Sequence, residues 1–186
     1  MIATGPLVSN DRRMLFLRLF LFLAFLGFSG ITANLEFNNV KCLTHGKEYV
    51  EFEYCYLKSI NRTYKYFSLK AVIHQLPVRN VKVEFKILKR DNRHIFEQFN
   101  GVVNVCKFFK DGQNAIAGLI FNTFTAYSNI NHTCPINHDI ILEKLPIQYV
   151  NKMAQPFIPQ GPYLLNLSWY TDNIARADVI VYFTKS

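Results

Sequence analysis

The sequence lacks the motifs by which most hydrolases and metalloproteins are recognised. It contains no Gly-x-Ser-x-Gly, so the common route to a serine nucleophile is missing, and its cysteines never fall as Cys-x-x-Cys. Carboxylate pairs such as Glu51 with Glu53 have the spacing of the solvent-facing side of a strand. The five histidines are scattered without the spacing of metal ligands: His45, His74, His94, His132 and His138. We therefore expect no enzymatic activity, no metal and no cofactor.

The chain also lacks a hydrophobic run long enough to span a membrane. Its most apolar stretch, residues 19–28, follows arginines that end at Arg18 and precedes the small residues of 29–33. This order is typical of a secretory signal peptide, whereas a spanning helix needs ~20 apolar residues. We expect residues 1–33 to be a signal peptide cleaved after Ala33. The protein is then secreted and extracellular.

Internal repeats, low-complexity tracts and linkers are absent. Removing residues 1–33 from the 186-residue chain leaves 153 residues, with 18 basic and 12 acidic side chains and a net charge of +6. This is the size of one ordinary domain, which we expect to be residues 34–186. A local basic patch has no base-stacking motif beside it, so we expect no nucleic-acid partner. The patch consists of Lys82, Lys86, Lys89, Arg90 and Arg93.

All four cysteines lie after the expected signal peptide: Cys42, Cys55, Cys106 and Cys134. An even number of cysteines in a secreted chain predicts two disulfides, for which the sequence allows three pairings. Pairing of nearest neighbours would close loops of 14 and 29 residues. In the chain-entropy description each bond would then contribute roughly 3 to 3.5 kcal/mol.

Three sequons predict N-linked glycans in a secreted protein. They begin at Asn61, Asn131 and Asn166. A glycan requires its asparagine to lie on the surface, so each sequon that is used would mark a face that no partner covers closely.

Strand patterns dominate the rest of the chain. In residues 81–88, valine, phenylalanine and isoleucine alternate with charged side chains, which predicts a half-buried strand. Seven further segments are rich in β-branched and aromatic residues: 36–43, 49–58, 64–76, 102–109, 138–145, 163–170 and 177–183. Turn residues separate them at regular intervals. The sequence thus predicts a mainly β protein, a two-sheet Ig-like β-sandwich of about eight strands.

One stretch departs from this pattern. Ile116, Leu119, Ile120, Phe124 and other apolar residues recur at helical spacing after Asp111-Gly112. We therefore expect an amphipathic helix over residues 113–127 that packs on a sheet.

The aromatic content is high, and many aromatic residues fall on one face of a strand. A filled core would explain them, because each aromatic side chain buries 150 to 250 Å². Alternatively, the two sheets enclose an apolar pocket for a lipid or a hydrophobic semiochemical. The residues expected to form its wall are Phe85, Ile87, Phe108, Leu119, Ile120, Phe124, Leu165, Leu167, Trp169 and Val181.

Five blocks in register with the cysteines resemble a known family. They are residues 37–42, 54–62, 106–109, 128–135 and 159–163, followed by Trp169. From about residue 36 to residue 183 the chain resembles an insect family of secreted proteins that share a domain of unknown function, number 1091, also called the DM8 domain.

The resemblance implies a sandwich similar to the lipid-recognition fold of the ganglioside activator protein, and kinship with the CheB chemosensory proteins. That fold binds lipids between its sheets without covalent chemistry. Cys134-Pro135 and Gly161-x-Tyr163 look like landmarks of this superfamily. Asn104 departs from the aspartate expected two positions before the third cysteine.

Two functions follow from these observations. The first is a secreted, non-enzymatic binding protein that holds a hydrophobic small molecule or lipid between its sheets. The second is an extracellular interaction module with a filled core that modulates a membrane receptor or ion channel, with Lys82, Lys86 and Arg93 as its candidate surface. A secreted hydrolase would require carboxylates or a histidine to converge in a cleft.

Overall fold

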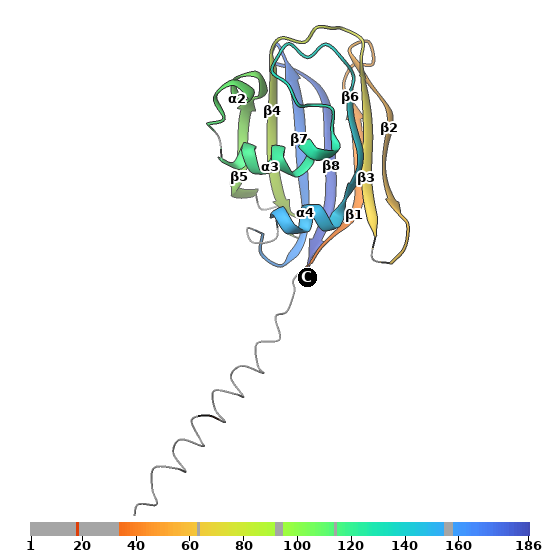
Figure 1. Cartoon of the computed structure of the whole chain (residues 1–186), viewed down its shortest axis with the longest axis vertical. Coiled ribbons are helices and arrows are strands. Elements are labelled where there is room, and N and C mark those ends of the chain that lie inside the picture. Colours follow the sequence, from red (N-terminus) through yellow and green to blue (C-terminus); the bar gives the residue numbers. More distant parts are fainter. Residues whose placement is uncertain (1–17, 19–33, 63, 92–94, 114, 155–157) are drawn as a thin grey trace, which may run out of the picture. The chain divides into compact units, whose positions relative to one another are not determined.

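Two antiparallel sheets build the described part of the chain, and the predicted two-sheet sandwich of about eight strands is confirmed there (Figure 1). The structure, a computed structural model, describes Arg18 and residues 34–186, apart from residues 63, 92–94, 114 and 155–157 and the side chains of 95–98 and 152–154. Arg18 aside, the expected signal peptide lies outside the described residues, as does Arg93 of the basic patch. Residues 34–186 fall within one compact unit.

The larger sheet has five strands in the order β1-β8-β7-β4-β5. Their bounds are β1 Leu35–Thr44, β8 Ile174–Lys185, β7 Gly161–Thr171, β4 Val81–Lys89 and β5 Ile95–Asn104. The smaller sheet has the order β2-β3-β6, with β2 Val50–Ser59, β3 Lys65–Ile73 and β6 Ile140–Pro146. The alternation read from the sequence holds in β4, where Val81, Phe85 and Ile87 are buried. Each sheet therefore turns one apolar face toward the other.

The sandwich is closed differently along its two sides. On one side β1 packs beside β2, and the Cys42–Cys55 disulfide links them with a Cα–Cα distance of 6.2 Å. On the other side, between β6 and the strands β4 and β5, the helices α3 (Ala115–Phe124) and α4 (Ile147–Ala154) run across the strands (Figure 1). The predicted helix over 113–127 is thus α3 with the 3₁₀ turn η1 (Thr125–Tyr127).

The second disulfide joins Cys106 to Cys134, with a Cα–Cα distance of 5.3 Å. Both bonds are therefore the nearest-neighbour pairings among the three that the sequence allows. Cys106 belongs to a short helix, α2 (Val105–Asp111), and the bond ties this helix to the loop before β6. The two bonds contribute about 3 and 3.5 kcal/mol of stability in the chain-entropy description, since they close loops of different length.

Helix α2 corrects the strand that the sequence predicted over 102–109. Strand β5 ends at Asn104, whose Oδ1 accepts a hydrogen bond from the Lys107 backbone N–H at 2.9 Å. Gly112 ends the helix with φ 65°, and its N–H donates to the Phe108 carbonyl at 2.8 Å. Asparagine and aspartate are equivalent N-caps, so the departure from the expected aspartate at position 104 preserves the cap. The local caps override the β propensity of the phenylalanines in between.

Four tyrosines line up on the outer face of the smaller sheet. Neighbouring rings of Tyr54, Tyr56, Tyr66 and Tyr64 have centroids 5.8, 6.4 and 6.2 Å apart. The hydroxyl of Tyr54 donates a hydrogen bond to the Glu143 carboxylate. This bond, more than burial, raises the pKa of Tyr54 to about 12 from its ordinary 10.0.

The Tyr54–Glu143 bond makes a pH-dependent contribution to stability. A phenol whose pKa is higher in the folded than in the unfolded state contributes stability that is complete below about pH 10 and is lost as the pH rises through about 12. We expect Glu143→Gln to lower the pKa of Tyr54 toward its ordinary value, because the charged acceptor is removed. An ultraviolet titration of phenolate formation measures this, with Tyr54→Phe identifying the signal. An unchanged alkaline titration in Glu143→Gln would contradict the assignment.

Candidate ligand-binding site

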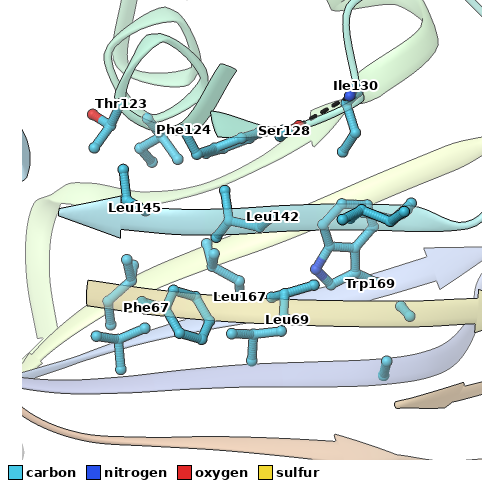
Figure 2. Close-up of a pocket in the computed structure, with 18 of the residues that line it drawn as sticks. Phe67, Leu69, Thr123, Phe124, Ser128, Ile130, Leu142, Leu145, Leu167 and Trp169 are labelled. Atoms are coloured by element: carbon cyan, nitrogen blue, oxygen red, sulfur yellow. Dashed lines mark hydrogen bonds between the residues drawn. The ribbon is translucent and has the colours of Figure 1, made fainter. Parts of the chain in front are cut away.

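An apolar cavity of about 230 Å³ lies between the two sheets. Phe67, Leu69, Leu142 and Leu145 of the smaller sheet face Leu167 and other residues of the larger sheet across it (Figure 2). Side chains of α3, among them Phe124, cover it from the open side of the sandwich (Figure 2). The cavity exists because the sheets carry apolar side chains at alternating positions that do not fill the space between them.

Most of the residues expected to form a pocket wall come together at this cavity. Eight of the ten line it: Ile87, Leu119, Ile120, Phe124, Leu165, Leu167, Trp169 and Val181. Phe85 and Phe108 do not. They line a smaller cavity of about 70 Å³ beside β4, β5, α2 and α3. That any of the ten contacts a ligand stays a prediction.

The two cavities are neighbours, divided by shared side chains. Six residues line both of them: Ile120, Phe124, Ile130, Ile136, Leu167 and Trp169. Around the smaller one, the rings of Phe108, Phe109 and Phe121 meet edge to face or tilted, with centroids 5.0 to 6.0 Å apart.

Few polar atoms face the larger cavity, and the serine and threonine hydroxyls among its lining residues have hydrogen-bond partners. The Thr123 hydroxyl donates to the Leu119 carbonyl at 2.7 Å, and Ser128 Oγ accepts from the Ile130 N–H at 2.9 Å (Figure 2). Thr171 Oγ1 accepts from Arg176 at 2.8 Å. An interior of this kind favours apolar groups over water.

Arg176 is the charged residue among the described residues that line the cavity, and sequence reasoning missed it. Strict alternation with Ala177 and Val179 assigns it to the opposite face of β8. The structure contains a β-bulge here, because Trp169 pairs with Ala177 whereas the next residue, Tyr170, pairs with Ala175. Arg176 and Ala177 consequently line the same cavity. Nothing in the residue pattern signals the bulge.

The basic patch along β4 is partly ion-paired. Lys82 Nζ donates to Asn173 Oδ1 at 2.7 Å, Lys86 Nζ lies 2.6 Å from Glu84, and Lys89 lies 3.4 Å from Asp91. Of the two described residues of the candidate surface of the interaction module, Lys86 is therefore ion-paired, whereas the amide partner of Lys82 is neutral and leaves the positive charge of Lys82 uncompensated.

The three sequons differ in accessibility. Asn61 and Asn131 are exposed, whereas Asn166 is half-buried in β7 and its Nδ2 donates to Ser168 Oγ at 3.2 Å. Glycosylation stays a prediction at each, and Asn166 offers the least accessible amide.

Over the described residues, the helices are all too short or too polar to cross a bilayer.

Residues 83–165 match the family described as "Protein of unknown function (DUF1091)". The match starts in β4, contains β5, α2, α3, β6 and α4, and ends in β7. It thus covers the helices that close the cavity and the Cys106–Cys134 disulfide. A comparison with curated proteins finds no match.

Proposed function

We propose that this protein is a secreted, non-enzymatic carrier that holds one hydrophobic small molecule or lipid between its sheets. The observation that carries the proposal is the apolar cavity of about 230 Å³. The two disulfides support the extracellular location, because such bonds persist in oxidising compartments. The resemblance to the CheB proteins and to the lipid-recognition fold supports a chemosensory role with a pheromone-like ligand.

The cavity volume limits the size of the ligand. Apolar cavities of ~150 Å³ bind benzene, and drug-sized ligands occupy ~300 Å³ or more. A cavity of about 230 Å³ therefore suits a single alkyl chain or a small ring system rather than a lipid with two chains.

Desolvation would supply the affinity. Burying ~300 Å² of apolar ligand surface contributes about 7.5 kcal/mol before association costs. Those costs amount to at least ~4 kcal/mol, so apolar contact alone gives weak binding. The alternative function, a module that modulates a membrane receptor or channel, expects a filled interior and is therefore less well supported.

Native mass spectrometry of the secreted, disulfide-intact protein tests the proposal. We expect a stoichiometric small molecule to accompany the protein, and organic extraction to identify its class. Trp169 gives a second readout, because it is the only tryptophan of the chain and lines the cavity, so its fluorescence should change when the cavity is filled. A ligand-free mass that stays unchanged after incubation with lipid mixtures would contradict the carrier and favour the receptor-modulating module.

A further inference from the structure

We propose that His132 and His138 together bind one divalent transition-metal ion of the Cu²⁺ and Zn²⁺ class. Both residues lie in the loop between η1 and β6, where their Nε2 atoms are 2.7 Å apart and their ring centroids 4.9 Å apart. Sequence spacing alone predicts no metal site here, because a loop rather than a helical turn brings the two rings together. Neither histidine lines either cavity, so this inference goes beyond the proposed carrier function.

The hydrogen bonds of the two rings leave their Nε2 lone pairs facing each other. His132 Nδ1 lies 2.6 Å from the Thr133 carbonyl oxygen. His138 Nδ1 lies 2.7 Å from the Asp139 carbonyl oxygen, to which Asn129 Nδ2 also donates at 2.7 Å. A carbonyl oxygen only accepts, so each Nδ1 carries a hydrogen, and a neutral imidazole has no second hydrogen for its Nε2. Two acceptor nitrogens that face each other at this distance need a cation between them.

A metal ion fits this arrangement. Metal-binding histidines almost always donate their other ring N–H to a carboxylate, a backbone carbonyl or water, which fixes the ring and raises the basicity of the ligand. Imidazole nitrogens suit Cu²⁺ and Zn²⁺, and the general affinity order places Cu²⁺ first. Metal–nitrogen distances of ~2.0–2.1 Å in tetrahedral geometry separate two ligand nitrogens by roughly 3.3 Å, so a small rotation of the exposed His132 ring would admit the ion. A single proton shared by the two Nε2 atoms is the competing occupant.

The backbone between the two histidines is held in place. Cys134 is tied to Cys106 by the second disulfide. Ile136 exchanges two backbone hydrogen bonds with Val78, at 2.8 and 2.9 Å, and is only 2% exposed. Ligands that are already positioned lose less conformational entropy when the ion binds.

Solvent would complete the coordination of the ion. The part of the chain that the structure describes contains no group of three or more His, Cys, Asp or Glu side chains that could hold a metal. The neighbouring carboxylate of Asp139 accepts from the Ile73 N–H at 3.1 Å. His132 is exposed and His138 half-buried, so water reaches the pair. Two protein ligands with open positions favour an exchangeable ion over a permanent structural one.

Metal titration of the secreted, disulfide-intact protein, purified without a histidine tag, tests the site. Calorimetry with CuCl₂ and ZnCl₂ gives affinity and stoichiometry, and electron paramagnetic resonance of the Cu²⁺ complex reports its nitrogen ligands. We expect one ion per chain with two imidazole nitrogens, and we expect His132→Gln and His138→Gln each to weaken Cu²⁺ binding at least ~10-fold. His45→Gln is the matched control. Its Nε2 lies 2.9 Å from Asp178 instead, so this variant should stay within ~3-fold of the wild type.

Three results would overturn the site. Failure of both ions to bind the wild-type protein would leave the shared proton as the occupant. Unchanged Cu²⁺ binding in both glutamine variants of the pair would place the ion at other residues. Loss of binding in only one of them would exclude an ion held by both rings. The wild-type spectrum reports the nitrogen ligands without any substitution, so a variant that fails to fold does not prevent the test.

Discussion

Replacing Leu167 with Asp should abolish ligand uptake. Leu167 lies in β7, between Phe85 of β4 and Val179 of β8 in the ladder, and lines both cavities. A carboxylate at this position would place a negative charge in an apolar interior, which costs several kcal/mol of free energy unless water enters with it. Either the charge or the water displaces the apolar ligand. We expect affinity to fall by ~100-fold or more, measured by Trp169 fluorescence and native mass spectrometry.

Leu164→Asp is the matched control for Leu167→Asp. It introduces the same charge three residues away in β7 but outside the residues that line either cavity, so binding should persist. A second variant, Val179→Phe, tests the same wall without a charge. Val179 is 5% exposed and lines the cavity, so the larger ring would occupy the space that the ligand needs. Full ligand uptake by folded Leu167→Asp and Val179→Phe would show that binding takes place elsewhere.

The strand pattern predicted the sandwich because burial of one face of each sheet makes apolar residues recur at every second position of a strand. In β7 this alternation places Tyr163, Leu165, Leu167 and Trp169 on one face. The helix over 113–127 was equally visible, because its apolar residues repeat at helical spacing. These elements were predictable because a single residue period dominates each of them.

Other elements depend on single local contacts that no period reveals. The side-chain cap from Asn104 and the left-handed Gly112 turn an aromatic, strand-like segment into α2. At Arg176, one extra residue in β8 brings an arginine side chain among the residues that line the cavity. Eight of the ten residues expected at the wall line one cavity, five from strand alternation and three from the helical spacing of α3. Strand alternation missed Arg176 because a bulge changes the phase of the alternation at one point.

The volume of the cavity could not be predicted from the sequence either. The same aromatic faces are compatible with a filled core, and whether side chains fill the gap depends on how α3 and the smaller sheet pack over it. Phe85 and Phe108 illustrate the point. Both belong to apolar faces, yet they line the smaller cavity because α2 and α3 pack against β4 and β5 there.

The resemblance landmark Gly161-x-Tyr163 has a physical basis in the structure. Gly161 adopts φ 139°, a conformation that residues with a side chain rarely adopt, and a Cβ there would lie 3.2 Å from the Lys89 side chain. Tyr163 is 1% exposed and stacks on Phe183, with ring centroids 5.5 Å apart and an interplanar angle of 22°. This pair anchors β7 to β8 at the end of the sandwich opposite Arg176, so the core here should be sensitive to truncation.

Replacing Tyr163 with Ala should lower the free energy of unfolding by about 3–5 kcal/mol, because the largest fully buried side chain of the described residues is removed and a void remains. That is a large share of the ~5–15 kcal/mol by which a domain is stable. Tyr163→Phe is the control. It keeps the stacked ring and loses the hydroxyl, which lies 3.5 Å from the Gln160 carbonyl, so it should cost about 1 kcal/mol. Urea unfolding measures both through the midpoint at constant slope.

The ligand-binding readout of the same variants shows whether this end of the core serves stability alone. Tyr163 is not among the residues that line the cavity, although its stacking partner Phe183 is. Ligand uptake by the folded Tyr163→Phe variant should therefore match that of the wild type. If the urea midpoint of Tyr163→Ala shifted no further than that of Tyr163→Phe, the result would contradict the anchoring role. A binding loss in Tyr163→Phe without loss of stability would instead extend the cavity wall to this residue.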